Sequence, residues 1–167
     1  MVHHVEQQSL NCMVITISDS RTKETDKSGK LMTALLDQAG HHVACAEIVK
    51  DDPTAIRAMT TKGVQDTAID IILTNGGTGI SHRDVTIETM KEMLHKEMTG
   101  FGEIFRMLSY QEDIGSAAIL SRAVAGVIDD TAVFSTPGST GAVKLAMNKL
   151  ILPELSHVVH ELHKDRN

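Results

Sequence analysis

Hydrophobic and polar positions form two kinds of block along the chain: short apolar runs, and longer segments in which apolar residues recur at helical spacing. The short runs predict strands at Cys12 to Ser18, His42 to Val49, Asp70 to Thr74, Ala123 to Ile128 and Thr131 to Ser135. The helical spacing predicts helices at Ser28 to Gln38, Pro53 to about Asp66, Ile87 to Leu94, Phe101 to Ser109, Ser116 to Ser121, and from Ala142 to the end. Strands separated by helices predict an α/β fold of three layers, α/β/α, with a mostly parallel sheet and one edge hairpin or antiparallel strand.

Local signals sharpen several of these boundaries. Gly40 is placed to stop the first helix, and Pro53 suits the first turn of the second. Thr86 can cap the helix that follows the glycine-rich segment, and Asp129-Asp130 predicts a tight turn between the last two strands. Pro153 predicts a break or kink in the C-terminal helix.

Composition limits the class of protein. A chain of 167 residues with 41% hydrophobic residues is long enough for one core, so we expect a single domain over 1–167 with a flexible N-terminal segment at 1–10. No apolar run approaches the roughly 20 residues that cross a bilayer, and the N-terminus has no signal-peptide pattern, so we expect a cytoplasmic protein without a membrane partner. The net charge of −6 and an aromatic content of 2% argue against a nucleic-acid partner. We interpret Cys12 and Cys45 as small buried hydrophobes.

Polar and glycine-containing segments follow four of the predicted strands. They are Ser18-Asp19-Ser20, Asp51-Asp52, a glycine-rich loop from Thr74 to Gly79, and Thr136-Pro137-Gly138-Ser139. Because parallel strands end at the same edge of a sheet, and ligands of open α/β sheets bind beyond these carboxyl ends, we expect the four segments to surround one site.

The loop Thr74-Asn75-Gly76-Gly77-Thr78-Gly79 has the composition of an anion site. Its glycines permit positive φ and a close approach of the backbone, so that consecutive N–H groups can face an anion. The hydroxyls of Thr74 and Thr78 would add donors. The loop matches neither the Walker A pattern nor GxGxxG, and a tight strand-to-helix turn without a ligand is the alternative.

Arg83-Asp84 strengthens the case for phosphate chemistry. Arg83 could pair with phosphate oxygens, and Asp84 could hold a Mg²⁺ ion that bridges phosphates. Helix capping is the alternative for Asp84, and equally for Asp52. The alternative for Asp19 is a structural role, in which it only accepts hydrogen bonds from neighbouring loops.

Other candidates are less specific. His82 could contact a ligand, whereas His157, His160 and His163 lie opposite the apolar face of their helix and are interpreted as surface residues. Arg122, after Ser121, could present its guanidinium to an anion or form an exposed ion pair.

Beyond these single features, the segment TNGGTGISHRDVTIE (74–88) resembles the TTGGTG…RDxT(P/I)E signature of the MoaB/MogA family of molybdenum cofactor biosynthesis proteins. Further segments resemble the family in the same order along almost the whole chain: ISDSR (17–21), IVKDD (48–52), GFGEIFR (100–106), AILSRAVAGV (118–127) and STPGSTGAVKLAM (135–147). Two positions depart from the adenylyltransferase pattern. Asn75 stands where a second Thr is frequent, and Ile87 replaces a frequent Pro, which makes the chain most similar to the MoaB branch.

The resemblance implies an α/β domain that binds molybdopterin and, in catalytic members, adenylylates its terminal phosphate with ATP and Mg²⁺, releasing pyrophosphate. It implies catalytic roles for Asp51 and Asp84, with Asp84 as a Mg²⁺ ligand. It implies substrate binding by the remaining pocket positions: Ser18, Asp19, Thr74, Asn75, Gly76, Gly77, Thr78, Gly79, Arg83, Ser116, Ser121, Pro137 and Gly138. The implied partners are these small molecules, copies of the chain in a trimer or hexamer, and a downstream molybdate-insertion protein. A non-catalytic molybdopterin-binding or carrier protein of the same pathway is the alternative function.

Overall fold

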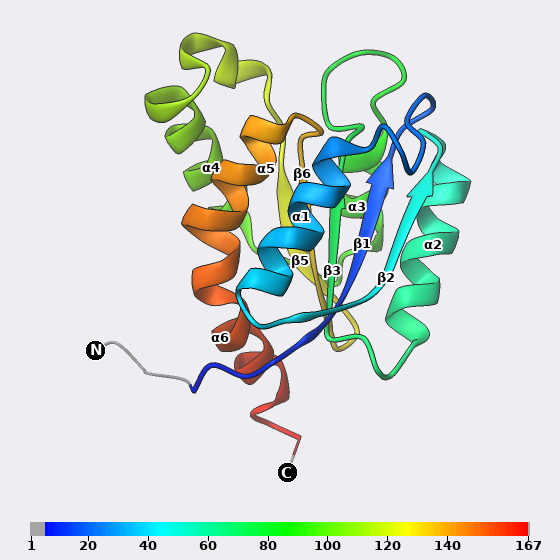
Figure 1. Cartoon of the computed structure of the whole chain (residues 1–167), viewed down its shortest axis with the longest axis vertical. Coiled ribbons are helices and arrows are strands. Elements are labelled where there is room, and N and C mark those ends of the chain that lie inside the picture. The colour runs from blue at the N-terminus through cyan, green and yellow to red at the C-terminus, as the bar shows by residue number, and fades with distance from the viewer. Residues whose placement is uncertain (1–5, 167) are drawn as a thin grey trace.

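One six-stranded sheet runs through the structure, a computed structural model that describes residues 6–166 (Figure 1). Its strands are β1 (Asn11–Ile17), β2 (His42–Val49), β3 (Ile71–Asn75), β4 (Lys96–Glu97), β5 (Val124–Ile128) and β6 (Thr131–Thr136). The order across the sheet is β2-β1-β3-β6-β5-β4, in which the first four strands are parallel, β5 is antiparallel to β6, and β4 is antiparallel to β5. The predicted α/β class, with a mostly parallel sheet and an antiparallel edge, is confirmed.

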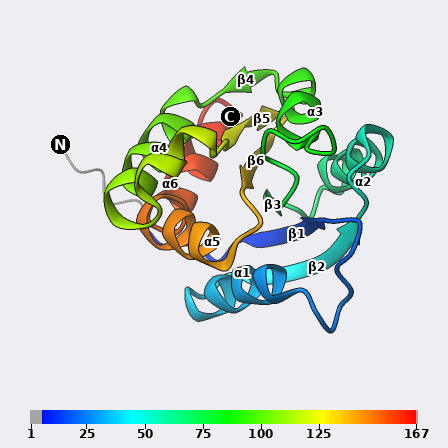
Figure 2. The ribbon, with the colours of Figure 1, turned by 90° about the horizontal axis from the view of Figure 1, so that it is seen from above.

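Helices cover both faces of the sheet, as the view from above shows (Figure 2). One face carries α1 (Lys27–Gln38), α4 (Thr99–Glu112), α5 (Thr140–Ala146) and α6 (Leu152–His163). The other face carries α2 (Pro53–Gln65) and α3 (Thr86–Met93). A short 3₁₀ helix, η1 (Gly115–Leu120), follows α4 and leads into β5.

The period-two pattern of β1 divides the core between these two faces. Cys12 and Val14 pack toward the layer that contains α1 and α4, whereas Met13 and Ile15 pack toward α2 and α3. Cys12 is fully buried, and this burial raises the pKa of its thiol to about 12. It therefore behaves as the predicted small hydrophobe, but Cys45 is only half-buried on the edge strand β2.

The start of α1 differs from the sequence prediction. The helix begins at Lys27 and its cap is Asp26, whose carboxylate accepts the N–H of Gly29 at 2.9 Å. Ser28 is not the capping residue, because its hydroxyl instead donates to the carbonyl oxygen of Gly138 at 2.5 Å. This bond ties the first turn of α1 to the segment that follows β6.

Two other predictions about helices, the cap of α2 and the break near Pro153, are confirmed. Asp52 caps α2 by accepting the N–H of Ala55 at 2.8 Å, as its capping interpretation requires. The C-terminal helical segment is interrupted before Pro153 by a π-helical turn, η2 (Met147–Ile151), which accommodates the missing N–H and the ring of the proline.

The described chain packs from Leu10 onward. Leu10 is buried, and its backbone N–H donates to Nδ1 of His41 at 3.2 Å, while burial lowers the pKa of His41. Residues 1–5 of the proposed flexible segment lie outside the described residues. Within residues 6–166, the helices are all too short or too polar to cross a membrane. The single domain, the flexible segment and the cytoplasmic location stay predictions.

Candidate functional site

The order of the strands reverses between β1 and β3, because the chain places β2 on one side of β1 and β3 on the other. The loops beyond the carboxyl ends of β1, β3 and β6 line a cleft of about 540 Å³ at this point, at the upper end of the sheet in Figure 1. The cleft lining includes these residues, all expected from the sequence: Ser18, Gly76, Gly77, Thr78, Gly79, Asp84, Ser121, Pro137 and Gly138.

The glycine-rich loop needs glycine for its path across the end of β1. Gly76 and Gly77 have φ values of +100° and +67°, which residues other than glycine rarely adopt. A Cβ atom at Gly76 would also lie 2.2 Å from the backbone oxygen of Ile17. The backbone of β3 therefore passes directly against the end of β1 before it turns toward α3.

Every carbonyl of segment 76–79 is hydrogen-bonded on the side of α3. The hydroxyl of Thr86 donates to the carbonyl oxygen of Gly76 at 3.0 Å, and the backbone N–H of Thr86 donates to that of Gly77 at 3.0 Å. Nε of Arg122 donates to the carbonyl oxygen of Thr78 at 3.0 Å, and Nη2 donates to that of Gly79 at 2.7 Å. Thr86 is thus the first residue of α3 and a support of the loop, and the prediction that it caps the helix is wrong.

The N–H groups of the same peptide units have no such partners. In a trans peptide the N–H and the C=O point to opposite sides, and the described chain has no cis peptide bond. Within residues 6–166, the N–H groups of Gly77, Thr78, Gly79 and Ile80 donate to no protein acceptor. Gly77, Thr78 and Gly79 line the cleft, and since the carbonyls of these peptide units face α3, their N–H groups are turned toward the cleft and can form a concave site for an anion. The N–H of Ile80 also points away from α3, although Ile80 lies outside the lining.

Asp84 stands at the edge of this donor array. Its Oδ2 atom accepts the N–H of Ser81 at 2.9 Å and the hydroxyl of Ser81 at 2.7 Å. A Cβ atom on Gly79 would lie 2.6 Å from the same Oδ2, so the carboxylate rests against the loop backbone. The cap of α3 is Val85, without a side-chain hydrogen bond, so Asp84 does not cap the helix.

Asp51 approaches the loop from the end of β2. Its Oδ1 atom would lie 2.7 Å from a Cβ on Gly77, and its backbone N–H donates to Oδ1 of Asp19 at 3.0 Å. Burial raises the pKa of the Asp51 carboxyl, the nearby carboxylates of Asp19 and Asp84 raise it further, and Arg83 partly offsets them. Negative charge therefore gathers around the glycine-rich loop, with Asp84 in the lining of the cleft and Asp19 and Asp51 outside it.

Thr74 and Asn75 lie beneath the loop and not in the cleft. Both are fully buried at the end of β3. The Thr74 hydroxyl donates to Oγ of Ser135 at 2.8 Å, and Nδ2 of Asn75 donates to Oγ1 of Thr16 at 3.1 Å. The expectation that the Thr74 hydroxyl offers a donor to the ligand is wrong, because that hydroxyl is used inside the sheet; Thr78 does line the cleft.

Comparison with known proteins agrees with this geometry. Residues 13–157 match the family model described as "Probable molybdopterin binding domain". The chain is 65% identical over 157 residues to molybdenum cofactor biosynthesis protein B of Bacillus subtilis (strain 168), which covers 94% of this chain and 92% of the relative. The chain belongs to the MoaB/MogA family. Its role therefore lies in molybdenum cofactor biosynthesis.

Solved structures of the MoaB/MogA family share the whole architecture. A crystal structure of molybdenum cofactor biosynthesis protein B has a TM-score of 0.93 and 57% identity, covering 95% of this chain and 99% of that one. The tungsten cofactor synthesizing protein MoaB from Pyrococcus furiosus has a TM-score of 0.82 and 37% identity, covering 93% of this chain and 98% of that one.

Several residues that the sequence or the family resemblance suggested lie outside the lining of the cleft. Arg83, His82 and Ser116 are exposed and do not line it, and neither do Asp19 after β1 and Asp51 after β2. Their roles in substrate binding or catalysis stay predictions. Among the described residues, no three His, Cys, Asp or Glu side chains converge closely enough to hold a metal ion, so a Mg²⁺ ion at Asp84 also stays a prediction.

The three C-terminal histidines agree with their interpretation as surface residues. His157 and His160 are exposed and His163 is half-buried. His157 contacts Glu154, one helical turn earlier, at 3.0 Å.

Arg21 is a site residue that single-residue reasoning missed. It lines the cleft, and its Nη2 donates to the carbonyl oxygen of Gly138 at 2.9 Å, while Nη1 lies 3.8 Å from Oδ1 of Asp26. The signal was a cation three positions after Ser18, whose hydroxyl oxygen accepts the N–H of Arg21 at 3.1 Å. The sequence motif ISDSR contained the residue, but its position in the cleft required the fold.

An apolar wall closes the other side of the cleft. Ile114, Ala117 and Leu120 all line it, at a spacing of three residues. In η1, a 3₁₀ helix with three residues per turn, this spacing places side chains directly above one another. The sequence predicted a helix from Ser116 to Ser121, but not that apolar side chains of this segment line the cleft.

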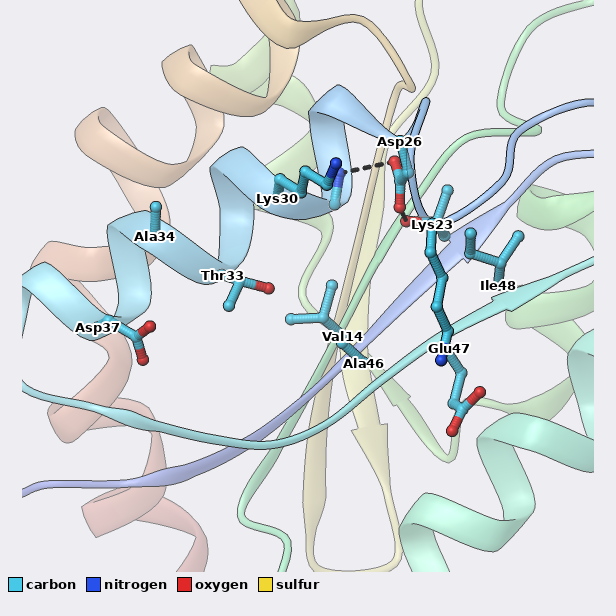
Figure 3. Close-up of a pocket in the computed structure, with 12 residues that line it drawn as sticks. Val14, Lys23, Asp26, Lys30, Thr33, Ala34, Asp37, Ala46, Glu47 and Ile48 are labelled. Atoms are coloured by element: carbon cyan, nitrogen blue, oxygen red, sulfur yellow. Dashed lines mark hydrogen bonds between the residues drawn. The ribbon is translucent and has the colours of Figure 1, made fainter.

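A second hollow, of about 460 Å³, lies between α1 and the edge strand β2 (Figure 3). Thr33, Ala34 and Asp37 of α1 lie on one side of it, and Ala46 and Glu47 of β2 on the other. The expected site residues all lie outside its lining, and it has no array of backbone donors comparable to segment 77–80 among the described residues. We therefore assign the site to the cleft at the ends of β1, β3 and β6.

Proposed function

We propose that the chain binds molybdopterin in this cleft and adenylylates its terminal phosphate with ATP, releasing pyrophosphate. The observation that carries the proposal is the array of unpaired N–H groups from Gly77 to Gly79, residues that line the cleft beside the carboxylate of Asp84. Such an array binds phosphate without a cluster of cationic side chains, as a chain with a net charge of −6 requires.

The two sides of the cleft suit the two parts of a pterin phosphate. The N–H groups of the loop and the guanidinium of Arg21 offer donors to phosphate oxygens. The apolar wall of Ile114, Ala117 and Leu120 offers contact to a flat heterocycle. A volume of about 540 Å³ is within the usual range for small-molecule sites.

The reaction makes few demands on acid–base chemistry. An oxygen of the terminal phosphate of molybdopterin forms a bond to the α-phosphorus of ATP, and the bond from that phosphorus to the bridging oxygen breaks, so pyrophosphate leaves with the electron pair. The second pKa of a phosphate monoester is about 6, so the nucleophile is largely ionised at neutral pH. Catalysis then rests on positioning two anions and compensating their charge, which the N–H array and Arg21 can do.

A Mg²⁺ ion would fit the carboxylate of Asp84, which lines the cleft. Mg²⁺ prefers hard oxygen ligands and binds through one or two carboxylates together with substrate phosphates and water. Asp84 and Asp51 both rest against the glycine-rich loop, and the pKa of Asp51 is raised first by burial and then by the neighbouring carboxylates of Asp19 and Asp84. When bound there, the ion would neutralise charge on the phosphates, with Asp84 as its principal ligand.

A non-catalytic molybdopterin-binding or carrier protein is the second candidate function. The observation that favours it is the position of Asp51, which rests behind Gly77 and does not line the cleft. A pterin could then occupy the N–H array and the apolar wall without a second acid at the reacting phosphate.

An anaerobic reaction with purified protein, molybdopterin, ATP and Mg²⁺ separates the two functions. We expect the release of pyrophosphate to require molybdopterin and to be abolished by removal of Mg²⁺. Binding of molybdopterin without any pyrophosphate release would overturn the adenylyltransferase proposal and support the carrier function.

A further inference from the structure

Arg122 occupies a position behind the glycine-rich loop. It does not line the cleft, whereas its chain neighbours Leu120 and Ser121 do. Its Nε and Nη2 atoms donate to the carbonyl oxygens of Thr78 and Gly79, at 3.0 and 2.7 Å. The guanidinium therefore faces the back of the loop, and both readings of Arg122 from the sequence, a direct anion ligand or an ion pair only, are incomplete.

The third partner of this guanidinium is the carboxylate of Glu88 on α3. Nη1 of Arg122 is hydrogen-bonded to Oε1 of Glu88, and Nη2 lies 3.3 Å from Oε2. Arg122 also holds the pKa of Glu88 below its ordinary value. The pair neutralises the charge of Arg122 and fixes the plane of the guanidinium relative to α3.

The two carbonyl bonds determine where two of the four loop N–H groups point. The Thr78 carbonyl belongs to the same peptide unit as the N–H of Gly79, and the Gly79 carbonyl to the same unit as the N–H of Ile80. A donor on each carbonyl therefore holds the opposite N–H on the side of the loop that faces away from α3. It also polarises the peptide, which strengthens that N–H as a donor to an anion.

We propose that Arg122 is a positioning residue for the phosphate: it orients the N–H groups of Gly79 and Ile80 and ties the loop to the apolar wall without touching the ligand. The inference rests on the anion-binding part of the proposed function and deepens it. Lysine cannot replace Arg122, because one ammonium group does not reproduce a planar fork that binds two successive carbonyls and a carboxylate.

The test compares Arg122→Lys with Arg57→Lys. Arg57 is a matched control, since its guanidinium pairs with Glu92 on the same helix α3 and its described hydrogen bonds involve no carbonyl of segment 76–79. Inorganic pyrophosphate is the probe, and its binding is followed by calorimetry and by the amide ¹H–¹⁵N resonances of residues 77–80. Thermal unfolding of both variants reports any general loss of stability.

For the wild type and Arg57→Lys, we expect pyrophosphate to shift all four amide resonances. For Arg122→Lys, we expect affinity for pyrophosphate to fall about tenfold, the loss of about one charge-assisted hydrogen bond. The resonances of Gly79 and Ile80 should lose their response, whereas Gly77 and Thr78, whose peptide units Thr86 holds, should keep theirs.

If Arg122→Lys does not fold, Glu88→Gln replaces it, because loss of the carboxylate loosens the guanidinium without removing it. A few-fold loss of affinity with the same pattern at Gly79 and Ile80 is then expected. Unchanged binding in both variants, an equal loss at all four amides, or no pyrophosphate binding by the wild type would overturn the role of Arg122. Absence of adenylyl transfer together with the expected amide pattern would overturn the proposed reaction alone.

Discussion

At the scale of single residues, a substitution at Asp84 distinguishes the binding of molybdopterin from the transfer of the adenylyl group. In Asp84→Asn the side-chain oxygen can still accept the two hydrogen bonds from Ser81, so the loop should keep its shape while the negative charge is lost. We expect nearly normal molybdopterin binding and a loss in rate of at least about a hundredfold, equivalent to about 2.7 kcal/mol of barrier. Single-turnover kinetics under anaerobic conditions measure both quantities.

Asp52→Asn is the matched control for this substitution. Asp52 lies at the same edge of the sheet but caps α2, and asparagine caps a helix about as well as aspartate. Its rate should equal that of the wild type. An unchanged rate in Asp84→Asn would leave Asp84 as a structural residue of the loop.

The ionised form of Asp51 lowers the stability of the folded protein, and the size of this effect depends on pH. Burial and the carboxylates of Asp19 and Asp84 raise its pKa in the folded protein, so the folded state disfavours the ionised form. This penalty is complete at neutral pH, shrinks as pH falls through the folded pKa, and vanishes below the unfolded pKa, near 3.8. Asp51→Asn should therefore be more stable than the wild type at pH 7, by about 0.5 kcal/mol after solvent screening.

Thermal unfolding of both proteins at pH 7 and pH 3.5 checks this prediction. The gain should correspond to about 1–2 °C at pH 7 and should disappear at pH 3.5. A gain that is independent of pH would mean that the substitution acts through packing and not through charge. A loss at pH 7 would mean that the Asp51 carboxylate stabilises the fold.

At the scale of elements, the turn from β3 into α3 depends on backbone geometry at Gly76. Gly76→Ala would combine a φ of +100° with a Cβ 2.2 Å from the Ile17 oxygen, so we expect a loss of at least about 2 kcal/mol in the free energy of unfolding. Gly40→Ala is the control, since Gly40 has a φ of +86° with nothing within 4 Å of its Cβ position. That variant should lose only about 1 kcal/mol. Urea unfolding that gives equal losses would contradict the close approach at Gly76.

The helices and strands also show how much of the structure can be predicted from the sequence. The bounds of β2 and the capping of α2 by Asp52 follow from local chemistry, and both are confirmed. The use of Thr74, Thr86 and Arg122 could not be predicted locally, because each partner is distant in the chain: Thr74 bonds Ser135, and the other two bond the loop. The residue type shows that a hydrogen-bonding group is present, whereas the fold determines which partner that group contacts.

At the scale of the whole molecule, the topology brings together the parts of the site. The reversal of strand order between β1 and β3 opens the cleft, and the segments after β1, β3 and β6 supply its walls. The sequence predicted this common edge because parallel strands separated by helices all end on it. The apolar wall was not predicted, because η1 follows the helix α4 and not a strand, so the rule that parallel strands end at a common edge does not place it.

An exposed apolar surface on α4 and the segment after it supports the predicted assembly with copies of the chain. Its large side chains are Ile104, Met107, Tyr110, Ile114, Ile119 and Leu120. Contiguous apolar surface of this kind marks interaction sites, and two of these side chains, Ile114 and Leu120, also belong to the cleft wall. We propose that a second copy covers this surface in a trimer or hexamer, as the family resemblance implies.

Light scattering after gel filtration tests the assembly. We expect the wild type to have the mass of a trimer or hexamer, and Met107→Lys to shift toward the monomer, because a buried unpaired ammonium is costly. Thr61→Lys, on the exposed face of α2, should leave the mass unchanged. A monomeric wild type would contradict the proposed assembly.

The central claim is that this cleft joins an adenylyl group to molybdopterin. Mass spectrometry of the pterin recovered from an anaerobic reaction with the wild-type protein, ATP and Mg²⁺ tests it most directly. We predict a product heavier than molybdopterin by one adenylyl group, formed with ATP and absent when Asp84→Asn replaces the wild type for the same short reaction time. Recovery of unmodified molybdopterin from protein that binds it tightly would contradict the claim.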